Sequence, residues 1–126
     1  MKKIYTETSV GEIIDKITIL EIKKKRISDK KSLSQINKEY SVLKSTIRKN
    51  IKINTKLRKL WKNLKDTNLK IWEMEDQKRY TQKYLESLSK LAKDVYKFND
   101  QRANIKSKIN KITKSNLREI KRYAKY

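Results

Sequence analysis

Residues 33–64 read LSQINKEYSVLKSTIRKNIKINTKLRKLWKNL and carry the most regular apolar pattern of the chain. Mostly apolar residues recur in alternating steps of three and four, which is the heptad pattern of a coiled-coil seam. The seam consists of Leu33, Ile36, Tyr40, Leu43, Ile47, Asn50, Asn54, Leu57, Trp61 and Leu64. At a rise of about 1.5 Å per residue, the pattern predicts one continuous helix roughly 50 Å long.

Two consecutive seam positions, Asn50 and Asn54, are polar. A buried Asn in a coiled coil often fixes the register or the choice of partner, at a cost in stability. A seam that is simply solvated at this point explains the two residues equally well. The sequence leaves both interpretations open.

Two further helical segments flank this stretch. Ser9-Val10-Gly11-Glu12 forms a capping box, and a helix follows to about Ser28. Its apolar residues lie on two faces, so we expect it to pack on two sides. Asp66-Thr67-Asn68 offers a second helix start, with a helix from Leu69 that breaks near Tyr80. Its later part carries a seam of its own, made of Leu88, Leu91, Val95, Phe98, Arg102, Ile105, Ile109 and Ile112.

Composition supports an all-helical chain. The 126 residues include one Gly and no Pro, and these are the residues on which tight turns between strands depend. We therefore predict an all-α fold, in which a short N-terminal helix packs on a long antiparallel helical hairpin in a three-helix, coiled-coil-like arrangement. The prediction is one domain over 1–126, with an irregular segment at 1–8 and a basic, weakly patterned tail at 113–126.

Composition also excludes several chemistries. A single Gly cannot form a phosphate-binding loop, which needs several glycines. The absence of Cys and His excludes zinc fingers, thiol nucleophiles and imidazole acid–base catalysis. Glu7, Glu12 and Asp15 interrupt what would be the apolar part of a signal peptide, and no apolar run is long enough to cross a membrane. A cytoplasmic location is therefore expected.

The net charge of +21 suggests a polyanionic partner, either nucleic acid or an anionic membrane surface. Nine basic residues and no acidic residue lie between Lys44 and Lys65. The candidate anion-binding face consists of Lys44, Arg48, Lys52, Lys56, Arg58, Lys59 and Lys62. The alternative is codon drift, because Lys, Asn and Ile are the residues that an A/T-rich genome supplies in excess.

A charged residue in the second seam predicts an internal polar cluster. Removing Arg102 from water requires a carboxylate partner. The candidate cluster consists of Asp15, Glu75, Asp76, Asn99, Asp100, Arg102 and Lys106. It is either a buried ion-pair network that fixes the register of the helices, or a ligand-binding or active site.

Two Glu-x-x-Asp spacings, Glu12/Asp15 and Glu73/Asp76, would each place two carboxylates on one helical face. Such pairs can hold Mg²⁺ for a phosphorylated substrate, as in all-α nucleotide pyrophosphohydrolases. Carboxylates at this spacing also occur by chance, and lysines crowd the same helices. We therefore predict no metal site and no cofactor, and keep a Mg²⁺-dependent or small-acid enzyme as an alternative.

Several segments together resemble a family of short bacterial proteins catalogued as a domain of unknown function. The family is marked by an SVGELIDKITILEIK opening, a W-x-x-E-D step and an ND-x-RA-x-IK step. Here they correspond to residues 9–23, 72–76 and 99–106. Its C-terminal EEK-x-Y-like run is matched in part, by Glu119, Lys121 and Tyr123. The resemblance implies no activity. Members of the family look similar to small proteins found among cell-surface polysaccharide genes, which suggests an accessory role in polysaccharide synthesis.

Taken together, these patterns favour a non-enzymatic binding or assembly module. One expected partner is a second copy or another protein, docked on the seam of residues 33–64. One alternative is binding of RNA or DNA through the basic face. The other is an enzyme that uses the acidic and arginine residues of the polar cluster.

Overall fold

The computed structural model describes residues 2–80 and 85–119. Four helices lie in these ranges: α1 (Val10–Arg26), α2 (Lys30–Asn50), α3 (Thr55–Tyr80) and α4 (Leu85–Ile112). These ranges contain no strand, so the all-α prediction is confirmed. The number of helices differs from the expected three, because residues 33–64 are divided between α2 and α3.

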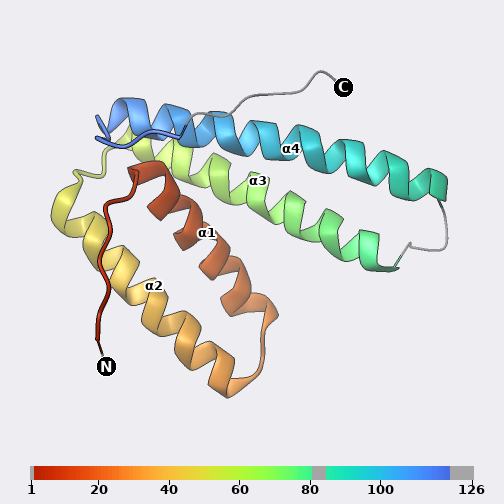
Figure 1. The fold of residues 1–126 in the computed structure, drawn as a ribbon, viewed down its shortest axis with the longest axis horizontal. Helices are drawn as coiled ribbons and strands as arrows, with labels where there is room; N and C mark the ends of the chain where they lie inside the picture. Colours follow the sequence, from red (N-terminus) through yellow and green to blue (C-terminus); the bar gives the residue numbers. More distant parts are fainter. Residues whose placement is uncertain (1, 81–84, 120–126) are drawn as a thin grey trace.

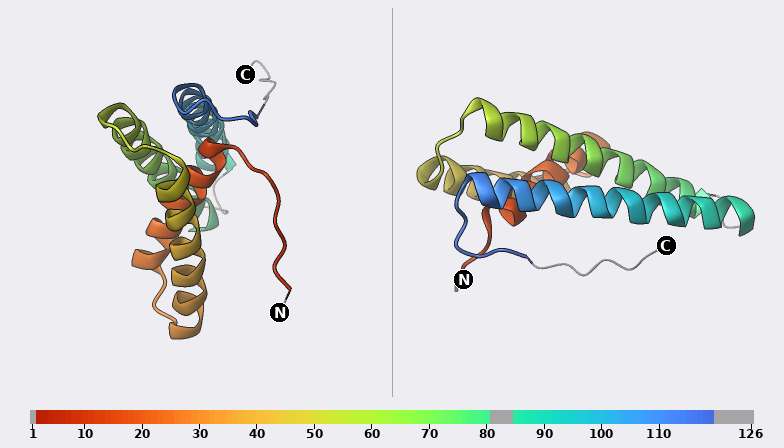
Figure 2. Two further views of the ribbon diagram at one scale, coloured as in Figure 1. Left: turned by 90° about the vertical axis from the view of Figure 1, so that its left-hand side faces the viewer. Right: turned by 90° about the horizontal axis from the view of Figure 1, so that it is seen from above.

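The helices form two antiparallel hairpins, α1 with α2 and α3 with α4, which diverge from one end of the molecule like the arms of a V (Figure 1). Within the described ranges, α1 packs against all three other helices, whereas α2 packs against α1. The expectation that the first helix packs on two sides is therefore confirmed. The extended residues 2–8 run away from the bundle (Figure 2).

The prediction of one continuous helix over residues 33–64 is wrong. The helix stops at Asn50, and the next one begins at Thr55. The Asn50 amide donates to the Thr46 carbonyl oxygen, and Asn54 Oδ1 accepts a hydrogen bond of 2.8 Å from the Leu57 N–H. Asn side chains that bond to nearby backbone groups end and start helices in this way. Both residues are exposed, so neither sets a register from within the core.

The predicted helix start at residues 66–68 is also wrong, because α3 continues through it. Thr67 and Asn68 are buried instead. The Thr67 hydroxyl donates to the Asn63 carbonyl oxygen, and the Asn68 side chain bonds across to α1. Residues that resemble a cap were thus buried polar groups with tertiary partners. The predicted interruption near Tyr80 agrees with the end of α3.

The core lies where the two hairpins meet. It consists of Ile14, Ile17, Ile47, Leu57, Leu64, Ile105 and Ile109, contributed by all four helices. Trp61, Leu60 and Tyr40 pack against it from the α2 and α3 side. None of the helices in the described ranges has a segment both apolar and long enough to cross a membrane. The described residues do not include the side chain of Leu88, in the predicted second seam, or residues 120–126, in the predicted tail.

Candidate functional site

The beginning of α1 is fastened to the end of α4. Ser9 caps α1 as predicted, accepting a hydrogen bond of 3.2 Å from the Glu12 N–H. The Gly11 N–H donates to Asn110 Oδ1 at 2.6 Å, and the Val10 N–H donates to the Ser115 hydroxyl. These bonds satisfy backbone donors that a helix start would otherwise leave unpaired.

Gly11 also permits the close approach of the two helices. A Cβ at this position would lie 2.7 Å from the Lys106 carbonyl oxygen and 2.9 Å from Asn110 Oδ1. Real Cβ atoms do not approach backbone oxygen this closely. The single glycine of the chain is therefore required for packing, and not for a phosphate-binding loop. We call this contact region, made of Gly11, Glu12 and Asp15 with Arg102, Lys106 and Asn110, the joint.

A buried ion pair crosses the joint one turn further along α1. The Asp15 carboxylate is 1% exposed and accepts hydrogen bonds from Arg102 Nε, at 2.8 Å, and from Arg102 Nη2. The Asn68 amide donates to Asp15 Oδ1 at 2.9 Å and to the Thr18 hydroxyl at 2.8 Å. The hydrogen bond and charge of Asp15 raise the pKa of Arg102 above its ordinary value. Both carboxylate oxygens of Asp15 are thus engaged by fixed donors.

A second ion pair lies beside the first. Lys106 Nζ is 2.6 Å from Glu12 Oε2 and 3.1 Å from Glu119 Oε2, and its side chain is 10% exposed. Burial works against the charged ammonium, but the hydrogen bonds that it donates to the Glu12 and Glu119 carboxylates outweigh this effect and raise the pKa of Lys106. Glu119 belongs to the segment after α4, which the bonds at Ser115 fold back along the helix. Lys121 and Tyr123 of the same run lie outside the described residues.

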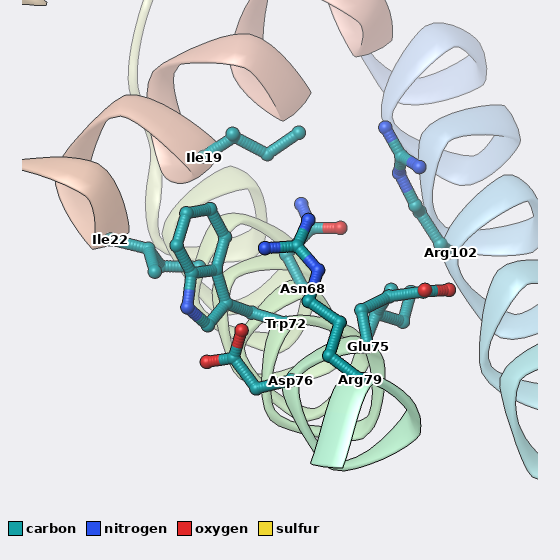
Figure 3. Close-up of a pocket in the computed structure, with 9 residues that line it drawn as sticks. Ile19, Ile22, Asn68, Trp72, Glu75, Asp76, Arg79 and Arg102 are labelled. Atoms are coloured by element: carbon teal, nitrogen blue, oxygen red, sulfur yellow. The ribbon is translucent and has the colours of Figure 1, made fainter. Parts of the chain in front are cut away.

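A cleft opens beside Arg102, between the diverging hairpins (Figure 3). Its volume is about 200 Å³. It is lined by Ile19, Ile22, Asn68, Ile71, Trp72, Glu75, Asp76, Arg79 and Arg102, from α1, α3 and α4. The isoleucines and Trp72 give it an apolar wall, and the remaining residues give it a polar rim. We call it the inter-hairpin cleft.

The charges on the rim of the inter-hairpin cleft differ in how they are paired. Glu75 forms an ion pair with Lys78 at 3.5 Å, and Arg102 is held by Asp15. Among the residues whose side chains the structure describes, 2–79 and 89–119, no ion pair joins Asp76 or Arg79 to another residue. Arg79 extends into the cleft rather than away from it (Figure 3). The cleft therefore presents one carboxylate and one guanidinium that the described fold leaves without a counter-charge.

The predicted polar cluster is brought together in part. Asp15 and Arg102 are in contact, and Glu75 and Asp76 line the same cleft as Arg102. Asn99 and Lys106 face the other side of Arg102, in a polar hollow of about 230 Å³ that Glu119 borders. Asp100 is half-buried on α4 and lines neither hollow.

The two Glu-x-x-Asp pairs do not form a metal centre. Glu12 and Asp15 bind two different cations of α4, and Glu73 lies 3.4 Å from Arg26. In the part of the chain that the structure describes, no three acidic side chains come close enough together to hold a metal ion.

The predicted anion-binding face is divided by the break between α2 and α3. Lys44, Arg58 and Lys62 line one concavity of about 390 Å³, together with Ile53, Trp61 and Lys65. We call it the elbow concavity. Arg48, Lys52, Lys56 and Lys59 are exposed and do not line it.

Sequence reasoning missed three residues that shape the inter-hairpin cleft: Asn68, Trp72 and Arg79. The run Asp66-Thr67-Asn68 is typical of a helix start, but the spacing of Asn68 from the residues that follow it indicates a shared face of one helix. Positions 68, 72, 75 or 76, and 79 recur in steps of three and four, so they share one face of α3. A face that combines Trp with charged residues next to a buried acid on another helix indicates a site.

The fold and site define a small all-helical protein with two hairpins, a buried Asp–Arg pair and a cleft beside it. Over residues 3–126 the sequence matches a family described as a family of unknown function, DUF6165. The chain belongs to this family, which confirms the resemblance seen in the sequence. Searches of the curated proteins and of the solved structures return no match.

Proposed function

We propose that the protein is a binding protein whose inter-hairpin cleft takes a small, acidic sugar. The observation that carries this proposal is the pairing of an apolar wall with two charges, Asp76 and Arg79, that have no counter-charge in the described fold. Predicted assembly through the seam of residues 33–64 has less support. Its members Ile36 and Ile47 are buried within the chain itself.

The chemistry of the cleft suits a sugar ring better than a purely apolar ligand. Trp72 offers an aromatic surface on which the C–H face of a sugar can pack. Asp76 and Glu75 accept hydrogen bonds from hydroxyl groups, and Arg79 can bind a carboxylate through two parallel N–H donors. A cleft of about 200 Å³ is smaller than the sites of drug-sized ligands, which start near 300 Å³, so it fits a single sugar unit.

Binding is favoured over catalysis by the state of the buried acid. Asp15 is the most buried carboxylate beside the cleft, but both its oxygens already accept hydrogen bonds from Arg102 and Asn68. A general acid or base must exchange a proton with a substrate within hydrogen-bond reach. The pair instead holds α1, α3 and α4 in position around the cleft. A sugar ligand also agrees with the polysaccharide link that the resemblance suggests.

The experiment uses intrinsic fluorescence. Because the chain has two Trp residues, Trp61→Phe leaves Trp72 as the single reporter in the cleft. Titration of this variant with glucuronate is expected to change the Trp72 emission in a saturable way, and glucose is expected to bind more weakly. A further Arg79→Gln change should weaken glucuronate binding about tenfold and bring it to the level of glucose, since it removes a charge-assisted hydrogen bond.

Arg48→Gln provides the matched control, because it removes one exposed guanidinium from α2 and leaves the cleft intact. We expect this variant to bind glucuronate like its parent. If neither sugar changes the Trp72 emission, the proposed ligand is wrong. If Arg79→Gln and Arg48→Gln weaken binding equally, the ligand does not bind in the inter-hairpin cleft.

A further inference from the structure

The elbow concavity combines an aromatic floor with a one-sided set of charges. Trp61 and Ile53 form its apolar part, and Lys44, Arg58, Lys62 and Lys65 surround them. It is about twice as large as the inter-hairpin cleft, at about 390 Å³ against 200 Å³. The break between α2 and α3 creates it, because Ile53 lies in that break and contributes to the wall.

The cations of the elbow concavity are not equivalent. Lys65 is held by Glu21 at 2.7 Å, and Lys44 Nζ lies 5.0 Å from the centre of the Trp61 ring. Arg58 and Lys62 form no ion pair with any residue in the described ranges. They are four residues apart on α3, where like charges repel each other and destabilise the helix. Lys44 also forms no ion pair within the described ranges, but it lies over the Trp61 ring, so Arg58 and Lys62 are the two cations of the concavity held neither by an acidic residue nor by that ring.

The surroundings reinforce this imbalance. Arg48, Lys52, Lys56 and Lys59 are exposed on the same two helices and the break between them, and no acidic residue occurs between Lys44 and Lys65. Residues 66–100, in contrast, contain seven basic and seven acidic residues. Codon drift alone would spread the excess lysines along the chain, whereas here the excess falls on two stretches: residues 44–65 around the concavity, and residues 101–126, which contain nine basic residues and one acidic residue.

We propose that the elbow concavity binds single-stranded nucleic acid, with a base against Trp61 and the flanking phosphates on Arg58 and Lys62. Aromatic side chains within a basic groove are the general means by which proteins hold single strands without sequence preference. A duplex does not suit the concavity, because its bases are stacked and cannot reach Trp61. A phosphate-rich membrane surface would use the same cations, but it would leave the aromatic floor without a planar partner. This inference is independent of sugar binding in the inter-hairpin cleft.

The test again uses a single reporter. Trp72→Phe leaves Trp61 as the single Trp, and a short oligouridylate is titrated at several salt concentrations. We expect saturable quenching of Trp61, with an affinity that falls steeply with salt. In this background Arg58→Gln with Lys62→Gln should weaken binding at least tenfold. The slope of log affinity against log salt should become shallower by about 1.4, since each phosphate contact on a single strand contributes about 0.7.

Lys108→Gln with Lys111→Gln is the matched control. It removes the same two charges from exposed positions of α4, so any general effect of net charge is equal. We expect it to weaken binding no more than twofold. Equal weakening by the two double variants would overturn the proposal, as would a Trp61 emission that oligouridylate leaves unchanged. Tighter binding to vesicles of phosphatidylglycerol and phosphatidylcholine than to oligouridylate, in the same buffer, would assign the concavity to a membrane surface instead.

Discussion

The joint and the elbow concavity arrange charge in opposite ways. At the joint, Asp15 is paired with Arg102 and Glu12 with Lys106, so every buried charge has a counter-charge on the neighbouring helix. At the elbow, Arg58 and Lys62 lie next to each other without one in the described fold. Charge at the joint is therefore paired within the fold, whereas at the elbow it is left without a counter-charge among the described residues.

The largest expected effect follows from breaking the joint. Asp15→Ala leaves Arg102 partly buried without its carboxylate and removes an acceptor from Asn68. Removing one partner of a buried ion pair costs roughly 3–5 kcal/mol, and the 29% exposure of the Arg102 side chain favours the lower end of that range. Urea unfolding followed by far-UV circular dichroism measures the loss directly.

Glu21→Gln is the control for this variant, because Glu21 pairs with Lys65 where both side chains are more accessible to water. Accessible pairs contribute about 0–1 kcal/mol, so its free energy of unfolding should stay near that of the parent. Equal losses for Asp15→Ala and Glu21→Gln would mean that the joint has no special role in stability.

The sequence allowed the helical class, and a carboxylate partner for Arg102, to be predicted for physical reasons. The apolar period of α1 gave its two buried faces, and a seam position occupied by Arg102 required a carboxylate, which Asp15 supplies. The break between α2 and α3 was missed because the heptad pattern continues through it. Asn50 and Asn54 fit the seam by spacing, but their side chains bond to nearby backbone and end the helix.

The inter-hairpin cleft was harder to predict than the joint. Its polar residues were identified only in part, because the cleft exists through the divergence of the hairpins, which no local pattern encodes. Asn68 shows the difficulty: the same residue type caps a helix in one context and bonds to a buried carboxylate in another. Only the position of α1 over α3 decides between the two.

A smaller effect is expected from the second ion pair of the joint, through pH. Because the pKa of Lys106 is raised in the folded protein, the stability it provides is complete below about pH 10.5 and is lost as pH rises through the folded-state value. Parent and Lys106→Met should differ by about 1.5–3 kcal/mol at neutral pH, the value of hydrogen bonds to a charged group. The difference should shrink above pH 10.5, as measured by urea unfolding at each pH.

Taking the difference between two proteins is necessary, because many other lysines lose their charge in the same range. Lys108→Met is the matched control, since Lys108 is exposed on the same helix. Its difference from the parent should be small and independent of pH. A gap between parent and Lys106→Met that stays constant, or widens, as pH rises would contradict the assignment.

The smallest effect on stability is expected at the elbow, and there its sign matters more than its size. Arg58→Gln with Lys62→Gln removes two like charges four residues apart, so the free energy of unfolding should stay the same or rise by about 0.2–0.5 kcal/mol. Lys108→Gln with Lys111→Gln changes the net charge equally, and the difference between the two variants in urea unfolding isolates the local repulsion. A loss of more than about 1 kcal/mol would show that Arg58 and Lys62 have structural partners, and it would remove the contrast between elbow and joint.

The opposite outcome is a free energy of unfolding that is unchanged or higher, together with weaker oligouridylate binding. It would show that the two charges serve ligand binding and do not stabilise the fold.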